Sequence, residues 1–380
     1  MELIIGILLG LAILVFLVVI HELGHAIVAR RNGVVVQEFG IGFPPRAWGK
    51  KLKNGILLSL NWLPLGGFVR MQGEHDAASG KGDYGAASFW QKTKILLAGV
   101  GINWLFAALL LTILALTGMP KVLPNQFSVP SDAAVDNSGV VLSTLASDLP
   151  ASKAGFRAGD VVTKFDDKQV VDASQFIELT KEYRGQNVEI NYERDGASQQ
   201  RDVTLLNNAD GPTFGAAVQQ TELVRHTWSA PIVGFGTAAQ LTLVTLQGLG
   251  QLVIDLVQGV VGQVSPSEDT RSRADEQLGQ VSDSVSGPVG ILGVLFPSVS
   301  QAGLTQIVFF TALISLSLAI MNFLPIPALD GGRWFTMAIF RIIKKPLTKE
   351  REENIQATGV LVLLALIVAV TFSDVSKLIN

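Results

Sequence analysis

The 380-residue chain contains no cysteine and only four histidines, and charged residues make up just 16% of it. The absence of cysteine excludes disulfide bonds, thiol catalysis and a cysteine-held metal, although it leaves the compartment open. Any metal must therefore be bound by His, Asp or Glu. Hydrophobic residues make up 48% of the chain and the mean hydropathy is +0.40, which excludes a purely cytosolic globule. The net charge of −3 gives no reason to expect a nucleic-acid partner.

Long uncharged stretches account for this hydropathy, and the first of them covers residues 3–20. Acidic Glu2 precedes this stretch, whereas basic Arg30 and Arg31 follow it. The positive-inside rule therefore predicts that the N-terminus lies outside the cytoplasm and that residue 30 lies inside. Five stretches are at least 18 residues long, enough to cross a bilayer as a helix: 3–20, 95–118, 229–254, 284–329 and 354–373.

Charge counts between these stretches predict four spans. Residues 30–94 contain ten Lys/Arg and four Asp/Glu, as cytoplasmic segments do, whereas residues 119–228 contain ten and fifteen, as suits a translocated domain. The basic residues within 341–351 should again be cytoplasmic. A crossing at 229–254 would place them outside, so we expect that stretch to be an amphipathic helix along the outer leaflet or a brace for the bundle.

Two regions between the spans favour strands. Residues 34–40 and 56–62 are more apolar than a cytoplasmic loop requires, so part of their sheet is expected to dip into the bilayer where protein satisfies its backbone. The acidic region after residue 119 is long enough for one small domain. It contains short strand patterns and one helix pattern: strands at 161–165, 188–192 and 202–206, and a helix near 174–184.

These patterns predict an α-helical polytopic membrane protein with four transmembrane helices, a membrane-associated β-hairpin region and an inserted extracytoplasmic domain. The lipid bilayer is its expected environment. The expected parts are a first membrane half at 1–118 that includes the β region at 34–70, the inserted domain at 125–210, a brace helix at 225–262, a mobile loop at 263–286 and a second membrane half at 287–380.

The inner end of the first span contains the sequence His21-Glu22-Leu23-Gly24-His25. Positions four apart share a helix face, so both imidazoles can reach one ion while Glu22 holds a water beside it. In metalloproteases with this H-E-x-x-H pattern, the two histidines bind zinc and the glutamate is the general base. The alternative is a polar helix end that faces the cytoplasm. Ionisable groups in apolar sequence are costly and usually functional, which favours the metal site.

Asp330 is the candidate for a third ligand. Catalytic zinc needs three protein ligands and one open position. His75 and His226 are predicted to be surface residues, whereas Asp330 ends the uncharged stretch 284–329 and needs a partner there. The two prolines and two glycines around it break the helix and free backbone groups for an unwound substrate. We expect Zn²⁺ as the cofactor, although this ligand set also suits other divalent cations.

The depth of the two candidate sites in the membrane agrees. His21 lies nine residues before Arg30 and Asp330 lies eleven before Arg341. These separations correspond to roughly 13 and 16 Å of helix. The two sites can share one plane if the segment with Asp330 runs from outside to inside. A crossing at 229–254 would reverse that direction, which is a second argument against it.

Two asparagines and one arginine lie near these sites. Asn322, eight residues ahead of Asp330, could donate to a peptide carbonyl or its oxyanion, or form a hydrogen bond between helices. Asn103 has the same two interpretations, and the structural one is favoured. Arg333 is expected to extend to the cytoplasmic interface.

Four further motifs follow one another along the chain: EFGIGFPP at 38–45, SLNWLPLGGFV at 59–69, PASKAGFRAGD at 150–160 and SGPVGI at 286–291. Together with the two ligand stretches, they resemble the site-2 protease family of intramembrane zinc proteases. The likeness is to the bacterial branch that cleaves anti-sigma factors and signal-peptide remnants, and it covers nearly the whole chain. The third motif resembles a PDZ domain.

The resemblance implies four spans, a zinc ion held by His21, His25 and Asp330, and Glu22 as the catalytic base. It implies that strands near residues 56–70 help to present substrate. It also implies that the PDZ domain restrains access by bulky ectodomains, and such a domain binds peptide tails.

Within those strands, the implied substrate-binding residues are Gly66, Gly67 and Phe68, in addition to Asn322. The chain departs from the family in two respects. Gly99-Val100 stands where family members often have Gly-Pro, and there is one PDZ motif in place of the tandem pair of some relatives.

We therefore expect a zinc-dependent endopeptidase of the cytoplasmic membrane that hydrolyses peptide bonds within transmembrane segments of single-span membrane proteins. Its N-terminus, PDZ domain and C-terminus are expected outside. The alternative is a catalytically silent adaptor whose histidines join two helices through zinc and whose PDZ domain binds peptides. A transporter would need more intramembrane carboxylates than Asp330 and Asp255.

Overall fold

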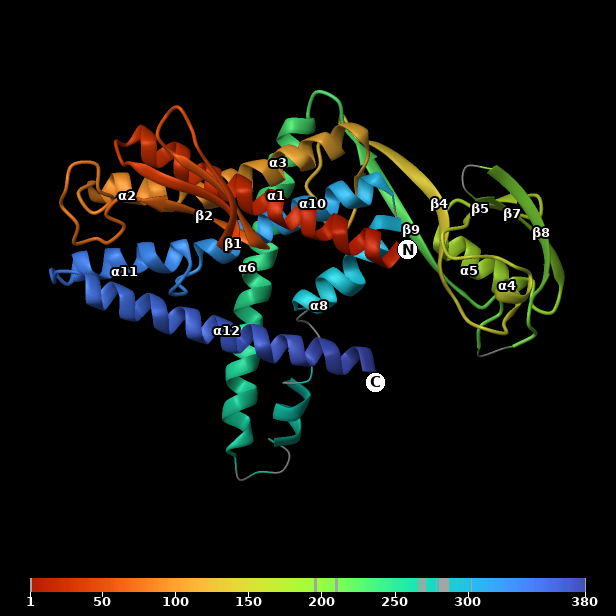
Figure 1. Cartoon of the computed structure of the whole chain (residues 1–380). Coiled ribbons are helices and arrows are strands. Elements are labelled where there is room, and N and C mark those ends of the chain that lie inside the picture. Colours follow the sequence, from red (N-terminus) through yellow and green to blue (C-terminus); the bar gives the residue numbers. More distant parts are fainter. Residues whose placement is uncertain are drawn as a thin grey trace. The chain divides into compact units, whose positions relative to one another are not determined.

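The uncharged stretches fold into long helices, as their length and composition dictate. The structure is a computed structural model (Figure 1), and it divides into a helical unit (Met1–Leu111 and Phe235–Asn380) and a sheet unit (Thr112–Gly234). It describes residues 2–194, 197–208, 211–265, 267, 271–277, 279, 287–301 and 303–379.

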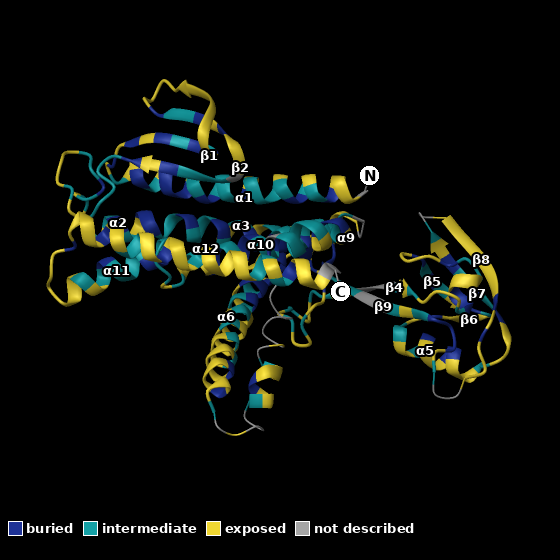
Figure 2. Cartoon of the chain, turned by 60° about the horizontal axis from the view of Figure 1, so that its bottom comes forward, coloured by how far each residue is buried: buried dark blue, intermediate teal, exposed yellow. Residues whose placement is uncertain are grey.

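Five helices within the described residues are long and apolar enough to cross a membrane. Most of their apolar side chains face outward, and Figure 2 shows exposed residues along α6 and α12 in particular. Such surfaces are stable only in lipid, so the chain is a polytopic integral membrane protein. Four of them correspond to the expected spans. The other one, α6, corresponds to residues 229–254, which the sequence analysis expects not to cross, and that expectation stays a prediction. The five helices are α1 (Glu2–Arg31), α3 (Ala98–Thr117), α6 (Ala230–Gln263), α10 (Leu304–Phe323) and α12 (Lys349–Ile379).

Small and polar residues bring α1, α3 and α10 together. A Cβ added at Gly24 of α1 would lie 2.7 Å from the Ala98 carbonyl oxygen of α3, so glycine permits this close approach. On its other side, α3 accepts a hydrogen bond from α10, because the Ser315 hydroxyl donates to the Asn103 carbonyl at 2.9 Å. Close backbones and interhelical hydrogen bonds are the usual means of helix association in lipid, where no hydrophobic effect acts between helices.

Shorter helices connect the long ones. Asp374 of α12 accepts hydrogen bonds from the amides of Gly287 and Gly290, at 3.0 and 2.8 Å, and so caps the helical stretch that begins at Pro288. Of the mobile loop expected at 263–286, residues 271–277 form a helix, and residues 266, 268–270, 278 and 280–286 lie outside the described part. The shorter elements are α2 (Phe89–Leu96), α8 (Pro288–Gly290), the π-helical turn η1 (Ile291–Leu295), α9 (Phe296–Gln301) and α11 (Asp330–Ile342).

The region between α1 and α2 forms the expected β-hairpin. Its strands, β1 (Val36–Lys51) and β2 (Leu57–Met71), pair antiparallel and are longer than the sequence predicts. The pairing is irregular, since the first part of β1 has partners near both ends of β2. Glu38 is buried in this sheet, where the Ser59 hydroxyl donates to it at 2.7 Å and Arg70 pairs with it at 3.2 Å. The buried charge is therefore both paired and hydrogen-bonded.

The sheet unit contains the strands and the helix expected after residue 119. Its sheet has the order β3-β9-β4-β5-β7-β8, with β6 paired to β5, and α4 and α5 complete the unit. Strand β9 lies beyond residue 210 and pairs with β4 along most of its length. The bounds are β3 (Met119–Pro120), β4 (Ala134–Leu145), α4 (Pro150–Lys153), β5 (Val161–Phe165), β6 (Lys168–Gln169), α5 (Ala173–Glu182), β7 (Asn187–Arg194), β8 (Ala197–Thr204) and β9 (Ala216–Arg225).

His226 of the sheet unit is buried, so its predicted surface position is wrong. Its side chain is covered because the strand end folds back here: the His226 amide donates to the Ala115 carbonyl. The Val129 amide donates to Nε2 at 3.4 Å, and the Ser128 hydroxyl lies 2.9 Å from the same atom. Burial lowers the pKa of His226, although the Asp132 carboxylate acts in the opposite direction.

We expect the sheet unit to lose stability in mild acid. A histidine whose pKa is lower in the folded protein than in the unfolded one favours unfolding as the pH falls through about 6.5, the ordinary histidine pKa. Hydrogen exchange of residues 112–234 in the full-length protein, compared at about pH 7.5 and about pH 5.5, should show more frequent opening at the lower pH. The variant His226→Gln should remove the difference and His75→Gln should keep it. Equal opening at both pH values would contradict the prediction.

Candidate metal centre

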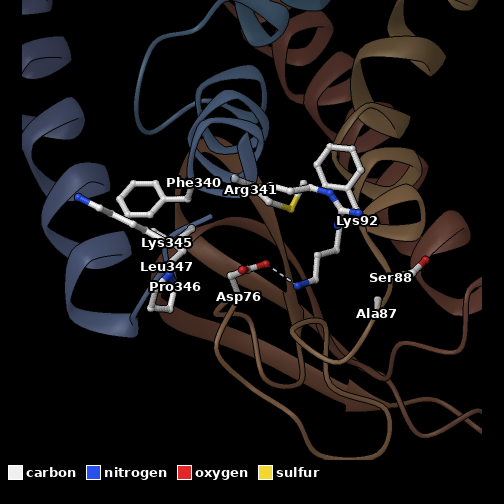
Figure 3. Close-up of a pocket in the computed structure, with 11 residues that line it drawn as sticks. Asp76, Ala87, Ser88, Lys92, Phe340, Arg341, Lys345, Pro346 and Leu347 are labelled. Carbon is white, nitrogen blue, oxygen red and sulfur yellow. Dashed lines mark hydrogen bonds and ion pairs between the residues drawn. The ribbon is translucent and has the colours of Figure 1, made fainter. Parts of the chain in front are cut away.

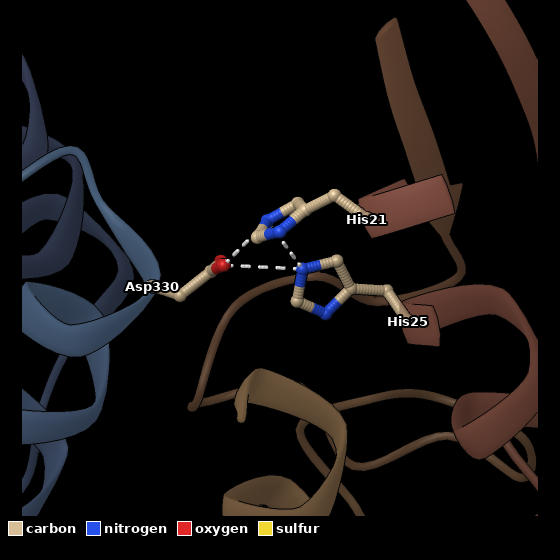
Figure 4. A group of neighbouring side chains, drawn as sticks. All are labelled: His21, His25 and Asp330. Carbon is tan, nitrogen blue, oxygen red and sulfur yellow. Dashed lines mark hydrogen bonds and ion pairs between the residues drawn. The ribbon is translucent and has the colours of Figure 1, made fainter. Parts of the chain in front are cut away.

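Three side chains from distant parts of the chain point toward one another (Figure 4). His21 and His25 lie one turn apart on α1, and Asp330 is the first residue of α11. Nε2 of His21 and Nε2 of His25 lie 3.2 Å apart, and Oδ2 of Asp330 lies 3.0 and 3.1 Å from them, respectively. Both histidines are buried, and the Asp330 side chain is 22% exposed. The group is thus largely shielded from solvent, with one partly open member.

The arrangement fits a divalent metal ion. Ligands of a tetrahedral zinc site, at 2.0–2.1 Å from the ion, lie about 3.3 Å from one another, close to the separations seen here. Nδ1 of His25 lies 2.7 Å from the Ile95 carbonyl, which can only accept, so Nδ1 carries the proton and Nε2 directs its lone pair to the centre. Imidazole and carboxylate donors suit zinc. The three residues that the sequence selects are therefore close enough to share one ion.

Gly99 of α3 forms one wall of this centre. A Cβ added there would overlap Nε2 of His25 and lie 2.7 Å from Nε2 of His21. Only glycine allows α3 to pass this close to both imidazoles. In the sequence, Gly99 stands out only as part of the Gly99-Val100 pair, and no local pattern there indicates a contact with the histidines.

Two glycines let the start of α11 pack closely against the end of α10 and the turn that follows it. Cβ atoms added at Gly331 and Gly332 would overlap the carbonyl groups of Phe323 and Ile326, respectively. Ala328, two residues before Asp330, has a φ of 82°, in the left-handed region that disfavours side chains. The chain therefore doubles back tightly between α10 and α11, and this turn sets where the carboxylate lies.

Glu22 lies between the histidines and the β-hairpin. It directly follows His21 on α1 and is partly buried. A Cβ added at Gly67 of β2 would lie 3.5 Å from its Cγ. Of the three hairpin residues expected to bind substrate, Gly67 is thus next to the expected base. Gly66 and Phe68 pack on β1, where they contact Phe43 and Gly40.

Among the described residues, neither asparagine side chain donates a hydrogen bond to another helix, and the expected substrate contact of Asn322 stays a prediction. The Asn322 amide donates to the Leu318 carbonyl of its own helix at 3.0 Å. Asn103 is buried, and neither polar atom of its side chain has a hydrogen-bond partner among the described residues. The hydrogen bond between α3 and α10 uses its backbone carbonyl, which accepts from Ser315.

Arg333 pairs with residues of other elements, and its expected place at the cytoplasmic interface stays a prediction. Its Nε donates to Glu352 of α12 at 3.2 Å, and its guanidinium lies 4.8 Å from the centre of the Tyr84 ring. It also donates to the Glu74 carbonyl. A buried carboxylate and an aromatic face thus compete successfully with solvent for this cation. Burial raises the pKa of Glu74, against the effect of the Arg333 charge.

A cavity of about 370 Å³ lies elsewhere, between α2 and the end of α11 (Figure 3). Lys92 and Asp76 form an ion pair in it, and Arg341 and Lys345 line its rim. None of the three converging residues lines this cavity. The candidate metal centre is therefore a separate site.

Bilayer-length helices around a His, His and Asp centre with a glutamate beside it define a membrane-embedded metallopeptidase. The model of peptidase family M50 matches residues 9–366, so the chain belongs to peptidase family M50, the site-2 protease family. It is 27% identical to the zinc metalloprotease RasP of Shouchella clausii, over 97% of this chain and 98% of that protein. It is 25% identical to the regulator of sigma-W protease RasP of Bacillus subtilis, over 95% and 96%.

Among solved structures, the PDZ domain of the SdrC-like protein from Listeria monocytogenes is 26% identical to this chain. The match covers 22% of this chain and 92% of that one, with a TM-score of 0.21.

The family and its relatives make the chain a zinc metalloendopeptidase of the membrane, with Zn²⁺ as its cofactor.

A side chain at Gly99 should disrupt the centre. We expect Gly99→Val to displace both imidazoles and to lower the zinc content of the purified protein at least about tenfold. Gly101 lies on the same helix and a Cβ added there meets nothing within 4 Å, so Gly101→Val is the matched control and should keep its zinc. Metal analysis of both variants, with thermal unfolding to confirm folding, checks this. Full zinc occupancy in a folded Gly99→Val protein would show that the centre does not need glycine at this position of α3.

Proposed function

We propose that the protein is an intramembrane endopeptidase that hydrolyses peptide bonds within transmembrane segments of single-span membrane proteins. The observation that carries the proposal is the approach of His21, His25 and Asp330 to within 3.0–3.2 Å, with Glu22 on the adjacent helix position. These residues lie on helices whose apolar surfaces require lipid, so a substrate bond must reach them within the membrane.

Each residue has a separate role in this mechanism. His21, His25 and Asp330 would hold the zinc ion, which when bound would polarise the scissile carbonyl and make water more acidic. Glu22 accepts a proton from the attacking water and passes it to the leaving nitrogen. The Ile95 carbonyl fixes the ring of His25 through its Nδ1 proton.

The β-hairpin is proposed to present the substrate. A helix buries its carbonyls in hydrogen bonds, so a transmembrane substrate must unwind before hydrolysis. Gly67 lies beside Glu22, and this contact supports a role for Gly66, Gly67 and Phe68 in holding an extended substrate close to the base. Asn322 is proposed to turn from the Leu318 carbonyl and donate to the substrate.

We propose the same topology that the charge pattern predicts. Four helices cross the membrane and α6 does not, with the N-terminus, the sheet unit and the C-terminus outside. The sheet unit acts as the PDZ domain that restrains access by bulky ectodomains and accepts peptide tails. The PASKAGFRAGD motif supports this role, since it supplies α4 and the buried Asp160 of that unit.

Replacement of the base should separate catalysis from metal binding. We expect Glu22→Gln to lower cleavage of a single-span substrate in proteoliposomes by about 10²–10⁴-fold, because proton transfer is lost, with zinc content unchanged. Asp330→Ala should lose both cleavage and zinc. The exposed Glu353 provides the control, since Glu353→Gln should keep both.

Cleavage is followed by the size of the products and the zinc content by metal analysis. If Glu22→Gln cleaved as fast as the wild type, the protease mechanism would be wrong, and a silent adaptor would explain the fold better.

A further inference from the structure

One face of α12 contacts the segment that carries Asp330. Glu352, Gln356 and Gly359 follow one another at spacings of four and three residues, so they share that face. Glu352 and Gly359 are buried and Gln356 is partly buried, whereas most of α12 beyond them is exposed. None of the three lies within the metal centre or the motifs that identify the family.

Gln356 contacts Ala328, a residue with an unfavourable backbone conformation. Its Oε1 accepts a hydrogen bond from the Ala328 amide at 2.7 Å, and Ala328 has a φ of 82°. A side-chain-bearing residue keeps such a conformation only when its surroundings fix it. Nε2 of Gln356 is buried and has no hydrogen-bond partner among the described residues. The contribution of this side-chain amide is therefore the hydrogen bond that its oxygen accepts from Ala328.

Gly359 and Glu352 act on either side of Gln356. A Cβ added at Gly359 would overlap the backbone of Pro327, so glycine lets the Asp330 segment lie directly on α12. Glu352 accepts from Nε of Arg333 at 3.2 Å and is itself fixed, since its other oxygen accepts from the Asp76 amide at 2.8 Å. These contacts hold residues 327, 328 and 333, which bracket Asp330 in sequence.

We propose that Glu352, Gln356 and Gly359, together the α12 clamp, are positioning residues that place Asp330 for metal binding. The inference rests on the proposed role of Asp330 as a ligand. His21 and His25 are fixed relative to each other by one helix, whereas Asp330 comes from a strained turn more than 300 residues away in sequence. A shift of that turn moves one ligand of three, so the clamp sets the affinity for zinc.

The test measures the zinc affinity of the full-length protein in detergent by competition with a chromogenic chelator. Gln356→Met removes the acceptor at similar volume and should raise the zinc dissociation constant about 10- to 100-fold, as loss of a group that orients a ligand does. Gln356→Glu keeps an acceptor and should stay near the wild type. Adding Ala328→Gly to Gln356→Met should restore affinity in part, because glycine adopts positive φ without strain.

Thermal unfolding of the metal-free variants distinguishes positioning from simple stabilisation. The clamp predicts lost affinity at an unchanged metal-free unfolding midpoint in Gln356→Met. A lower midpoint with unchanged affinity would assign Gln356 a purely structural role and overturn the proposal. Glu353→Gln, on the exposed side of the same helix, should change neither quantity.

The variant Asp330→Ala distinguishes a failure of the ligand role of Asp330 from a failure of the α12 clamp. If that variant bound zinc as tightly as the wild type, the ligand role would fail and the clamp with it. If Asp330→Ala lost affinity while Gln356→Met and Gly359→Val both retained it, the ligand role would stand and the clamp alone would be wrong.

Discussion

The close approach of two imidazoles and one carboxylate inside an apolar bundle is the constraint on which the rest of the structure depends. Such groups are costly to bury unless a cation neutralises and orders them. The fold brings them together through close backbone contacts more than through large side chains. Gly24 and Gly99 let α3 pass beside α1. Gly331 lets α11 begin against the end of α10, and Gly332 lets it lie against Ile326 of the turn. In lipid, where helices gain nothing from hiding apolar surface, such contacts decide which helices meet.

Much of the centre could be predicted from the sequence, because its information is local. The spacing of His21 and His25 places them on one helix face, and the isolation of Asp330 in an uncharged stretch marks it as needing a partner. The hairpin strands and β5, β7 and β8 follow from short-range patterns as well, whereas the sequence analysis does not predict β4 or β9. The spacing of residues along a helix or strand and the charge of a segment depend on only a few neighbouring residues, so they can be read before the fold is known.

The rest depends on contacts between distant segments, which no local pattern encodes. His226 is polar and lies near a predicted boundary, yet the strand end folds back over it. Arg333 lies three residues from Asp330 and finds Glu352 and Tyr84 on other elements. The spacing of Glu352, Gln356 and Gly359 was visible in the sequence, but its meaning requires knowing what lies against that face.

Gly99 also determines the direction from which reactants can arrive. The imidazoles have no free side toward α3, since even one methyl group would not fit between them and that helix. Glu22 and Gly67 occupy another flank of α1, next to the hairpin. In the proposed mechanism, the attacking water and the scissile bond must then reach the imidazoles from a side that α3 does not cover, whereas Glu22 already lies beside them on α1. A small molecule that occupied the side of the imidazoles away from α3 would therefore exclude the nucleophile and the substrate together.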